Sequence, residues 1–130
     1  MIMQKGKKDC LQATLSNLLK IPYEEIPAFT ELYESMEDFN KEYDKWLFSR
    51  GYIRILFDYD ITKLPWISDQ ILMIGILKKD NRDYSHAVII QYIHSGPKTV
   101  KIELVHDPLK ESDYDIKDLI QIEIITKHDY

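Results

Sequence analysis

The chain contains a single cysteine, Cys10, which opens an apolar-periodic run and has Gln4 six residues before it. A thiol in the first turn of a helix can act as a nucleophile, but only with suitable partners. It needs a base for its proton, a group that orients that base, and donors for the oxyanion formed in acyl transfer. A lone cysteine does not establish this chemistry, because free cysteines usually pack as small hydrophobic residues. The remaining chain must therefore supply the partners.

The candidates for the base are the four histidines: His86, His94, His106 and His128. His94 adjoins a Gly-Pro turn and His128 lies in the C-terminal tail, so both are expected to be solvated. His86 differs because it stands between the polar loop 78–83 and an apolar strand. At such a boundary a rigid element can present a side chain to a cleft, so His86 is the predicted base.

The hairpin that follows His86 suggests the group that orients it. A four-residue turn at Ser95–Lys98 would pair His94 with Thr99 and, counting back, His86 with Asp107. Directly opposed residues of antiparallel strands share a face, with Cβ atoms about 4.5–5.5 Å apart. We therefore predict an imidazole–carboxylate pair, which fixes the tautomer and favours the imidazolium. A slip of one residue would place the two on opposite faces.

Gln4 completes the predicted site, and Asp107 has a structural interpretation besides the catalytic one. The side-chain amide of Gln4 can join the backbone N–H of Cys10 to form an oxyanion hole, although a glutamine near a terminus is by itself a surface residue. The Asp107-Pro108 dipeptide is also typical of a turn that ends a strand. Both interpretations of Asp107 can hold together.

The elements that would position these residues begin with a helix from Cys10 to about Lys20. Its apolar residues follow the i, i+4, i+7, i+8 spacing of one helical face: Leu11, Leu15, Leu18 and Leu19. Asp9 is predicted to be the N-cap, with its carboxylate accepting first-turn N–H groups, and Gly6 allows a turn before it. The proline-bracketed segment 21–27 predicts the end of the helix and a short helical turn.

Downstream, one helix is predicted from about Thr30 to Arg50, ended by Gly51 at the C′ position. Strands are then predicted at 52–57, 71–77, 86–93, 99–106 and 120–126, with a Pro65-containing connection and a short helix near 114–119. Helices first and strands after indicate an α+β fold, in one domain over residues 1–130.

Composition narrows the function classes. The chain is 45% hydrophobic and 30% charged, as in soluble globular proteins, and its net charge of −5 argues against nucleic-acid binding. No signal peptide or membrane-spanning run is present, so no membrane association is expected. One cysteine cannot form an internal disulfide, which fits a cytoplasmic location.

Together these motifs resemble the papain-like cysteine peptidase superfamily. The match consists of Gln4, Asp9-Cys10, His86-Ala87-Val88 and Asp107-Pro108, in that order. Within the superfamily, the chain is most similar to bacteriocin-processing (double-glycine leader) peptidase domains and related small stand-alone bacterial and phage proteins. The similarity covers roughly residues 4–27 and 84–108, and no motif falls in 28–83.

The resemblance implies a papain-like fold, in which the helix that carries the nucleophile packs on an antiparallel sheet. It assigns Cys10 as nucleophile, His86 as general acid/base, Asp107 as orienting residue and Gln4 as oxyanion donor. Leader peptidases usually have glycine directly after the cysteine, where this chain has Leu11. No cofactor is implied, and the expected partner is a protein or peptide substrate.

The predicted function is a cysteine peptidase or related thiol hydrolase that cleaves an amide through a thioester. The same triad serves amidases, deamidases and acyltransferases, and these alternatives stay open. A non-catalytic protein that binds a host protein on the same scaffold is another alternative, although binding alone has no need of the four catalytic identities. A zinc site around Cys10, His86, His106 and Asp107 lacks ligand spacing, so no metal is expected.

Overall fold

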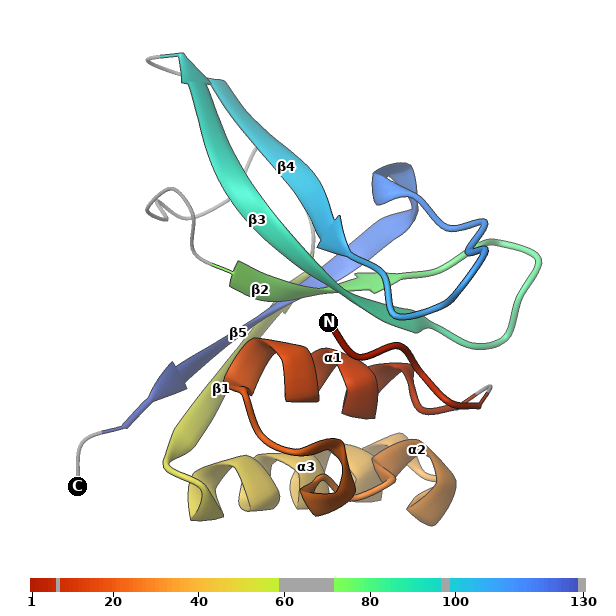
Figure 1. The fold of residues 1–130 in the computed structure, drawn as a ribbon, viewed down its shortest axis with the longest axis vertical. Helices are drawn as coiled ribbons and strands as arrows, with labels where there is room; N and C mark the ends of the chain where they lie inside the picture. Colours follow the sequence, from red (N-terminus) through yellow and green to blue (C-terminus); the bar gives the residue numbers. More distant parts are fainter. Residues whose placement is uncertain (7, 59–71, 97–98, 129–130) are drawn as a thin grey trace.

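The structure is a computed structural model and describes residues 1–6, 8–58, 72–96 and 99–128 (Figure 1). It is an α+β fold in which three helices pack on a five-stranded antiparallel sheet, as the order of helices and strands predicts. The helices are α1 (Cys10–Leu19), α2 (Phe29–Leu32) and α3 (Met36–Ser49). The strands are β1 (Tyr52–Asp58), β2 (Leu72–Leu77), β3 (His86–Gly96), β4 (Thr99–His106) and β5 (Leu119–Lys127).

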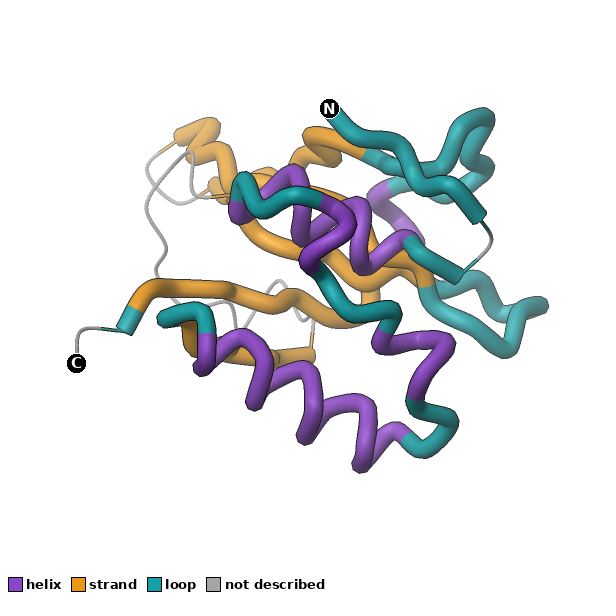
Figure 2. The backbone as a smooth tube through the Cα atoms, turned by 60° about the horizontal axis from the view of Figure 1, so that its bottom comes forward, coloured by secondary structure: helices purple, strands orange, loops and turns teal. Residues whose placement is uncertain are grey.

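The sheet has the strand order β1-β5-β2-β3-β4, so β5, the last strand in sequence, inserts between β1 and β2. Helix α1 packs on β3 and β2, and α3 packs on β1 at the other end of the sheet (Figures 1 and 2). A predicted helical turn is present at Tyr23–Glu25, and the short helix predicted near 114–119 is a 3-10 turn at Ile116–Asp118. The Pro65-containing connection lies outside the described residues.

Side chains on both faces of the sheet are buried. One apolar cluster lies between the helices and the sheet and includes Leu11, Leu15, Phe29, Tyr43, Leu47, Ile74 and Ala87. The other cluster lies on the opposite face and includes Met73, Leu77, Val88, Ile90, Tyr92, Tyr114 and Ile122. Alternate residues of β2 and β3 therefore contribute to different clusters, as the period of a strand requires.

The first helix agrees with the predicted range, but its N-cap does not behave as predicted. Asp9 occupies the N-cap position, yet its side chain makes no hydrogen bond to the helix. The carboxylate instead accepts hydrogen bonds from the backbone N–H groups of Lys5 and Gly6. The prediction that Asp9 caps the first turn is wrong, because the N–H groups of Lys5 and Gly6 in the preceding turn bind the carboxylate instead.

The single helix predicted over Thr30–Arg50 is also wrong, because the structure divides it into α2 and α3. Tyr33 is extended, and Ser35 then caps α3, with its hydroxyl accepting the N–H of Asp38 at 3.1 Å. Serine competes well for first-turn N–H groups and so begins a new helix. Gly51 follows α3 with φ of 89°, as predicted for a residue after a helix.

The predicted register of the β3–β4 hairpin is wrong by one residue. His94 pairs with Val100 rather than Thr99, and residues 97–98 of the predicted turn lie outside the described residues. A second irregularity falls between Ile89 and Ile90, where pairing shifts from Ile90–Leu104 to Ile89–His106. This bulge adds one residue to β4, which reverses the direction of the side chains that follow it. The side chain of Asp107 therefore lies on the same face as His86, as predicted, although the register differs.

Among the described residues, none of the helices combines the length and apolar character needed to cross a bilayer.

Candidate active site

Cys10 is the first residue of α1 and is partly exposed, so a reagent can reach its thiol. One helical turn further on, the buried Thr14 hydroxyl donates a hydrogen bond to the backbone carbonyl of Ala87 at 3.0 Å. Ala87 follows His86 in β3. The bond therefore fixes the helix that carries the thiol directly against the strand that carries the imidazole.

His86 and Asp107 meet as predicted, although not by the predicted register. His86 Nε2 lies 2.6 Å from Asp107 Oδ1, and the imidazole is 4% exposed. Asp107 lies just beyond the end of β4, where the bulge has restored its side chain to the face of His86. The contact between His86 and Asp107 is confirmed. However, Asp107 lies beyond the end of β4 and is not paired with His86 in the sheet.

Cys10 is the second partner of the His86 ring. Burial by itself would lower the pKa of His86, but hydrogen bonds to Asp107 and Cys10 outweigh it and raise this pKa to about 9. At neutral pH the ring is therefore an imidazolium, with Nε2 directed at the carboxylate. The three residues form a continuous chain of contacts from Asp107 through His86 to Cys10.

The Asp107 carboxylate is held ionised. Burial would raise its pKa, but the hydrogen bond from His86 and further donors lower the pKa below the ordinary value. One of these donors is the backbone N–H of Leu109, at 2.9 Å from Oδ1. Asp107 is therefore fixed from two sides and orients the imidazole.

Tyr114 is a residue of this site that sequence reasoning did not single out. Its ring stacks on His86 with 4.7 Å between centroids and 22° between planes. On Tyr114 itself, the Arg82 guanidinium lies 4.9 Å from the ring centroid, and Arg82 pairs with Asp113. The loop before β3 and the loop after β4 thus hold Tyr114 against the imidazole. A tyrosine in a polar loop carries no local pattern that would reveal this stacking.

Gln4 lies in the N-terminal segment, next to the Asp107 turn. Its backbone N–H donates to the carbonyl of Pro108 at 2.9 Å, and its side-chain Nε2 donates to the carbonyl of Gly6 at 2.8 Å. Its Oε1 is buried and has no hydrogen-bond partner among the described residues. The Gln4 side-chain amide therefore donates to its own local turn, and Gln4 is not among the described residues that line the cleft beside Cys10.

His106 and His128 do not join this group. His106 pairs with Ile89 on the opposite face, and its Nε2 lies 3.4 Å from the carbonyl oxygen of Ile2. His128 stacks on Phe48 at 4.4 Å. The side chain of His94 lies outside the described ones. Within the described ranges, no three histidine, cysteine or acidic side chains are grouped so that they could hold a metal ion.

A cleft of about 530 Å³ opens beside Cys10 and His86 and runs towards α3 and β1. Its apolar lining includes Leu11, Tyr33, Phe39, Leu56 and Ile76. Its charged lining includes Lys8, Glu34, Arg54, Asp83 and Glu123. The cleft is large enough for several side chains of an extended peptide, and its lining combines apolar and charged side chains.

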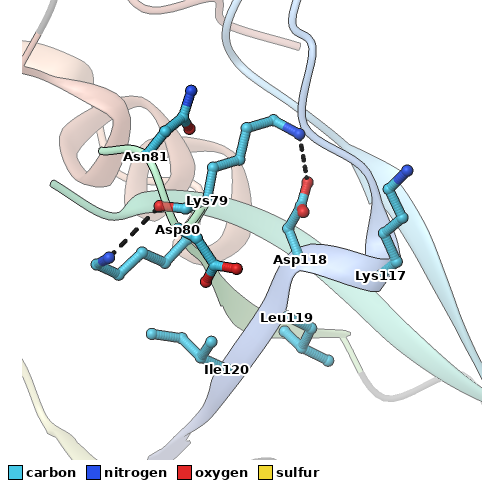
Figure 3. A pocket seen from close by; sticks show the side chains of 8 residues that line it. Lys79, Asp80, Asn81, Lys117, Asp118, Leu119 and Ile120 are labelled. Carbon is cyan, nitrogen blue, oxygen red and sulfur yellow. Dashed lines mark hydrogen bonds and ion pairs between the residues drawn. The ribbon is translucent and has the colours of Figure 1, made fainter. Parts of the chain in front are cut away.

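A second cavity, of about 540 Å³, lies away from the cysteine, between the loop after β2 and the start of β5 (Figure 3). It is lined by three lysines, but Lys79 Nζ lies 3.1 Å from Asp118 Oδ2 and Lys78 Nζ donates to the carbonyl of Lys79 (Figure 3). Lys117 pairs with Asp115. Two of the three lysines are therefore paired with carboxylates. The described lining contains no cysteine, serine or histidine, so the cleft beside Cys10 is the better candidate.

Comparison of the chain with protein-family models, curated proteins and solved structures gave no match.

Proposed function

We propose that this protein is a papain-like cysteine hydrolase that cleaves an amide bond in a protein or peptide. Cys10 is the nucleophile, His86 the general acid/base, Asp107 the residue that orients His86, and Gln4 an oxyanion donor. The observation that carries the proposal is the chain of contacts from Asp107 to His86 to Cys10, which ends at a partly exposed thiol in a cleft. A buried cysteine that serves only packing has no need of such a chain.

The charge state of His86 favours this chemistry. An imidazolium beside a thiol stabilises the thiolate, which is the nucleophilic form of cysteine. The thiolate attacks the substrate carbonyl carbon, and the resulting oxyanion accepts hydrogen bonds from the Cys10 N–H and the Gln4 amide. His86 then gives its proton to the leaving amine as the C–N bond breaks, which leaves a thioester on Cys10.

The second half of the cycle returns the enzyme to its starting state. Neutral His86 takes a proton from a water molecule, and the resulting nucleophile attacks the thioester carbon. The C–S bond breaks, the carboxylic acid is released, and His86 is again an imidazolium beside the thiolate. If an amine or hydroxyl group replaces water, the same site acts as an acyltransferase. If the substrate is a side-chain amide, the reaction is a deamidation.

Alkylation of Cys10 with iodoacetamide tests the proposed ion pair directly. The rate should stay high at pH 6–7, where an ordinary thiol of pKa about 8.5 is mostly protonated. His86→Gln should lower the rate at pH 6.5 by at least about tenfold, because the imidazolium is lost. His106→Gln is the matched control, since this histidine faces the other side of the hairpin, and it should alkylate like the native chain.

Labelling that needs denaturant, or equal rates for native and His86→Gln chains, would contradict the proposed nucleophile. The reaction class can then be read by mass spectrometry. Native and Cys10→Ala chains are incubated with peptide amides, ubiquitin-like conjugates and glutamine-containing peptides. A thioester on the native chain that the Cys10→Ala chain lacks would identify the bond. Binding of a protein partner without any turnover would favour the non-catalytic alternative.

A further inference from the structure

Asp9 is a buried carboxylate directly before the proposed nucleophile, and none of the catalytic steps uses it. It is 6% exposed and accepts three hydrogen bonds. Two come from the backbone N–H groups of Lys5 at 2.6 Å and Gly6 at 2.8 Å. The third comes from the hydroxyl of Tyr23 at 2.7 Å. A buried charge that is satisfied from three directions is held in one orientation.

That orientation is unusual for the residue at the start of a helix. An N-cap carboxylate normally accepts N–H groups of the first turn and places its negative charge at the helix N-terminus. The Asp9 side chain makes no such bond, although its backbone carbonyl still accepts the N–H of Ala13 at 3.0 Å. The carboxylate therefore does not compete for the first-turn N–H groups, which include that of Cys10.

The turn that Asp9 binds is the one that carries Gln4. Gly6 donates its N–H to Asp9 and accepts the Gln4 side-chain N–H through its carbonyl, at 2.8 Å. The N-terminal segment runs beside α1 (Figure 1), where Ile2 makes two hydrogen bonds with the Asn17 side chain. The Gln4 amide is thus connected to Asp9 through a single residue, and both ends of the turn are tied down.

We propose that Asp9 is a positioning residue that holds the turn 4–6 so that the Gln4 amide meets the oxyanion beside the Cys10 N–H; this inference rests on the proposed function. Asp9 touches no reacting atom. It acts through the backbone of Lys5 and Gly6, while Tyr23 supports it from the segment after α1. Because the same carboxylate makes no hydrogen bond to the first turn of α1, it leaves the Cys10 N–H available for the oxyanion.

The ionisation of Asp9 is consistent with this role. Burial would raise its pKa, but hydrogen bonds from the Lys5 N–H, the Tyr23 hydroxyl and the Gly6 N–H outweigh burial and lower it. The Tyr23 pKa is raised to about 12, first by burial and then by its hydrogen bond to Asp9. Tyr23 therefore remains a donor, and Asp9 an acceptor, at neutral pH.

Two reagents separate positioning of the oxyanion donor from general support of the fold. Iodoacetamide alkylates Cys10 by displacement of iodide at a saturated carbon, so no oxyanion forms. p-Nitrophenyl acetate acylates the thiolate through a tetrahedral oxyanion; a C–S bond forms, the C–O bond breaks and p-nitrophenolate leaves. An oxyanion-positioning residue affects only the second reaction, whereas loss of His86 affects both.

The experiment measures both rates for the full chain and for Asp9→Asn, Gln4→Ala, the double variant and Tyr23→Phe. Acylation should fall at least about tenfold in Asp9→Asn and in Gln4→Ala, in line with loss of one oxyanion donor. The double variant should be no slower than the slower single variant, because both changes remove the same interaction. Alkylation should be unchanged, or faster in Asp9→Asn because a negative charge near the thiolate is gone. Glu37→Gln, at an exposed position of α3 that does not line the cleft, is the control and should match the native chain in both rates.

Each other outcome has a distinct meaning. Equal losses of acylation and alkylation in Asp9→Asn would overturn the inference and leave Asp9 as a structural anchor. Gln4→Ala with native acylation, while His86→Gln loses both reactions, would also overturn it and leave the rest of the proposed function standing. A native thiol inert to both reagents would overturn the proposed function itself. If Asp9→Asn does not fold, Tyr23→Phe keeps the charge and should still lower the ratio of acylation to alkylation.

Discussion

At the scale of single residues, the proposed site depends on the contact between His86 and Asp107. This contact and the Cys10 thiol raise the pKa of His86 to about 9 against the effect of burial. Tyr114 stacks on the same ring and limits how the imidazole can rotate. The orientation and charge of the His86 ring are therefore set by one residue at the start of α1 and two residues in the loop after β4.

Asp107→Asn should lower the pKa of His86 towards the ordinary value of 6.5, because the carboxylate that stabilises the imidazolium is gone. The shift can be read from the imidazole C–H resonance in an NMR titration. In the native chain the interactions that raise the pKa of His86 also stabilise the folded state. This contribution is fully present below pH 6.5 and is lost as the pH rises through about 9.

The loss of unfolding free energy in Asp107→Asn should accordingly be largest near pH 5–6 and smaller above pH 9. Lys101→Gln changes an exposed charge on β4 and should show no such dependence on pH. A loss of stability that is the same at pH 6 and pH 10, or a His86 pKa that does not move, would contradict the pairing.

At the scale of elements, the relation of α1 to β3 places the thiol beside the imidazole. The packing of Leu11 and Leu15 on Ala87 is apolar and gives little directional control. The buried hydrogen bond from the Thr14 hydroxyl to the Ala87 carbonyl is directional and lies one turn from Cys10. We expect this bond to set the position of the helix along the strand.

Thr14→Val keeps the shape of the side chain but leaves the Ala87 carbonyl without its side-chain donor. The free energy of unfolding should fall by about 1–3 kcal/mol, and alkylation of Cys10 should slow because the helix can shift. Thr14→Ser keeps the hydroxyl and loses a methyl group, at a cost of about 1 kcal/mol. Denaturant unfolding and the alkylation rate measure the two effects. Equal alkylation rates for the valine and serine variants would argue against control by this bond.

At the scale of the whole molecule, a buried polar group joins α3, β1 and β5 on the helix side of the sheet. Tyr43 donates its hydroxyl to Glu123 at 2.9 Å, and Arg54 Nη1 lies 3.4 Å from the same carboxylate. The guanidinium also lies 4.5 Å from the Tyr43 ring centroid and pairs with Asp44. Burial raises the pKa of Glu123 more than these partners lower it.

Arg54→Met should reduce the free energy of unfolding by roughly 3 kcal/mol at pH 7, because an ionised Glu123 is left without its cation. The cost should shrink towards pH 4, where the carboxylate is protonated. The sign follows from the raised pKa of Glu123, since ionising such a group costs stability as the pH increases.

The matched control is Arg50→Met, which breaks an exposed pair with Glu25. It should cost less than about 1 kcal/mol at either pH. A cost for Arg54→Met that does not depend on pH would show that lost packing of the side chain, rather than an unpaired charge, causes the effect.

Most of the local structure could be predicted from the sequence. The spacing of leucines predicted α1, the glycine at 51 predicted the end of α3, and apolar runs predicted all five strands within a few residues. These features depend on neighbours within one or two turns of the chain, so a local pattern contains them. The one helix predicted over 30–50 failed because Ser35 competes locally as a cap, a signal that is present in the sequence but weak.

The contact between His86 and Asp107 was also predicted, but it was inferred from a strand register that the structure does not have. The hairpin is shifted by one residue as far as Ile90–Leu104, and the bulge beyond it increases the shift to two residues, which returns Asp107 to the face of His86. Bulges arise from the packing of the whole sheet and cannot be counted from the turn alone.

The contacts that support the site depend on how separate elements pack against one another. Three contacts join different segments of the chain. They are the hydrogen bond from Tyr23 to Asp9, the stacking of Tyr114 on His86 and the hydrogen bond from Thr14 to Ala87. The energy of such a contact depends on where two separate elements pack, and no periodicity along the chain records it. The sequence thus determined which residues could form the site, while packing of α1 against the sheet decided which side chains hold them in place.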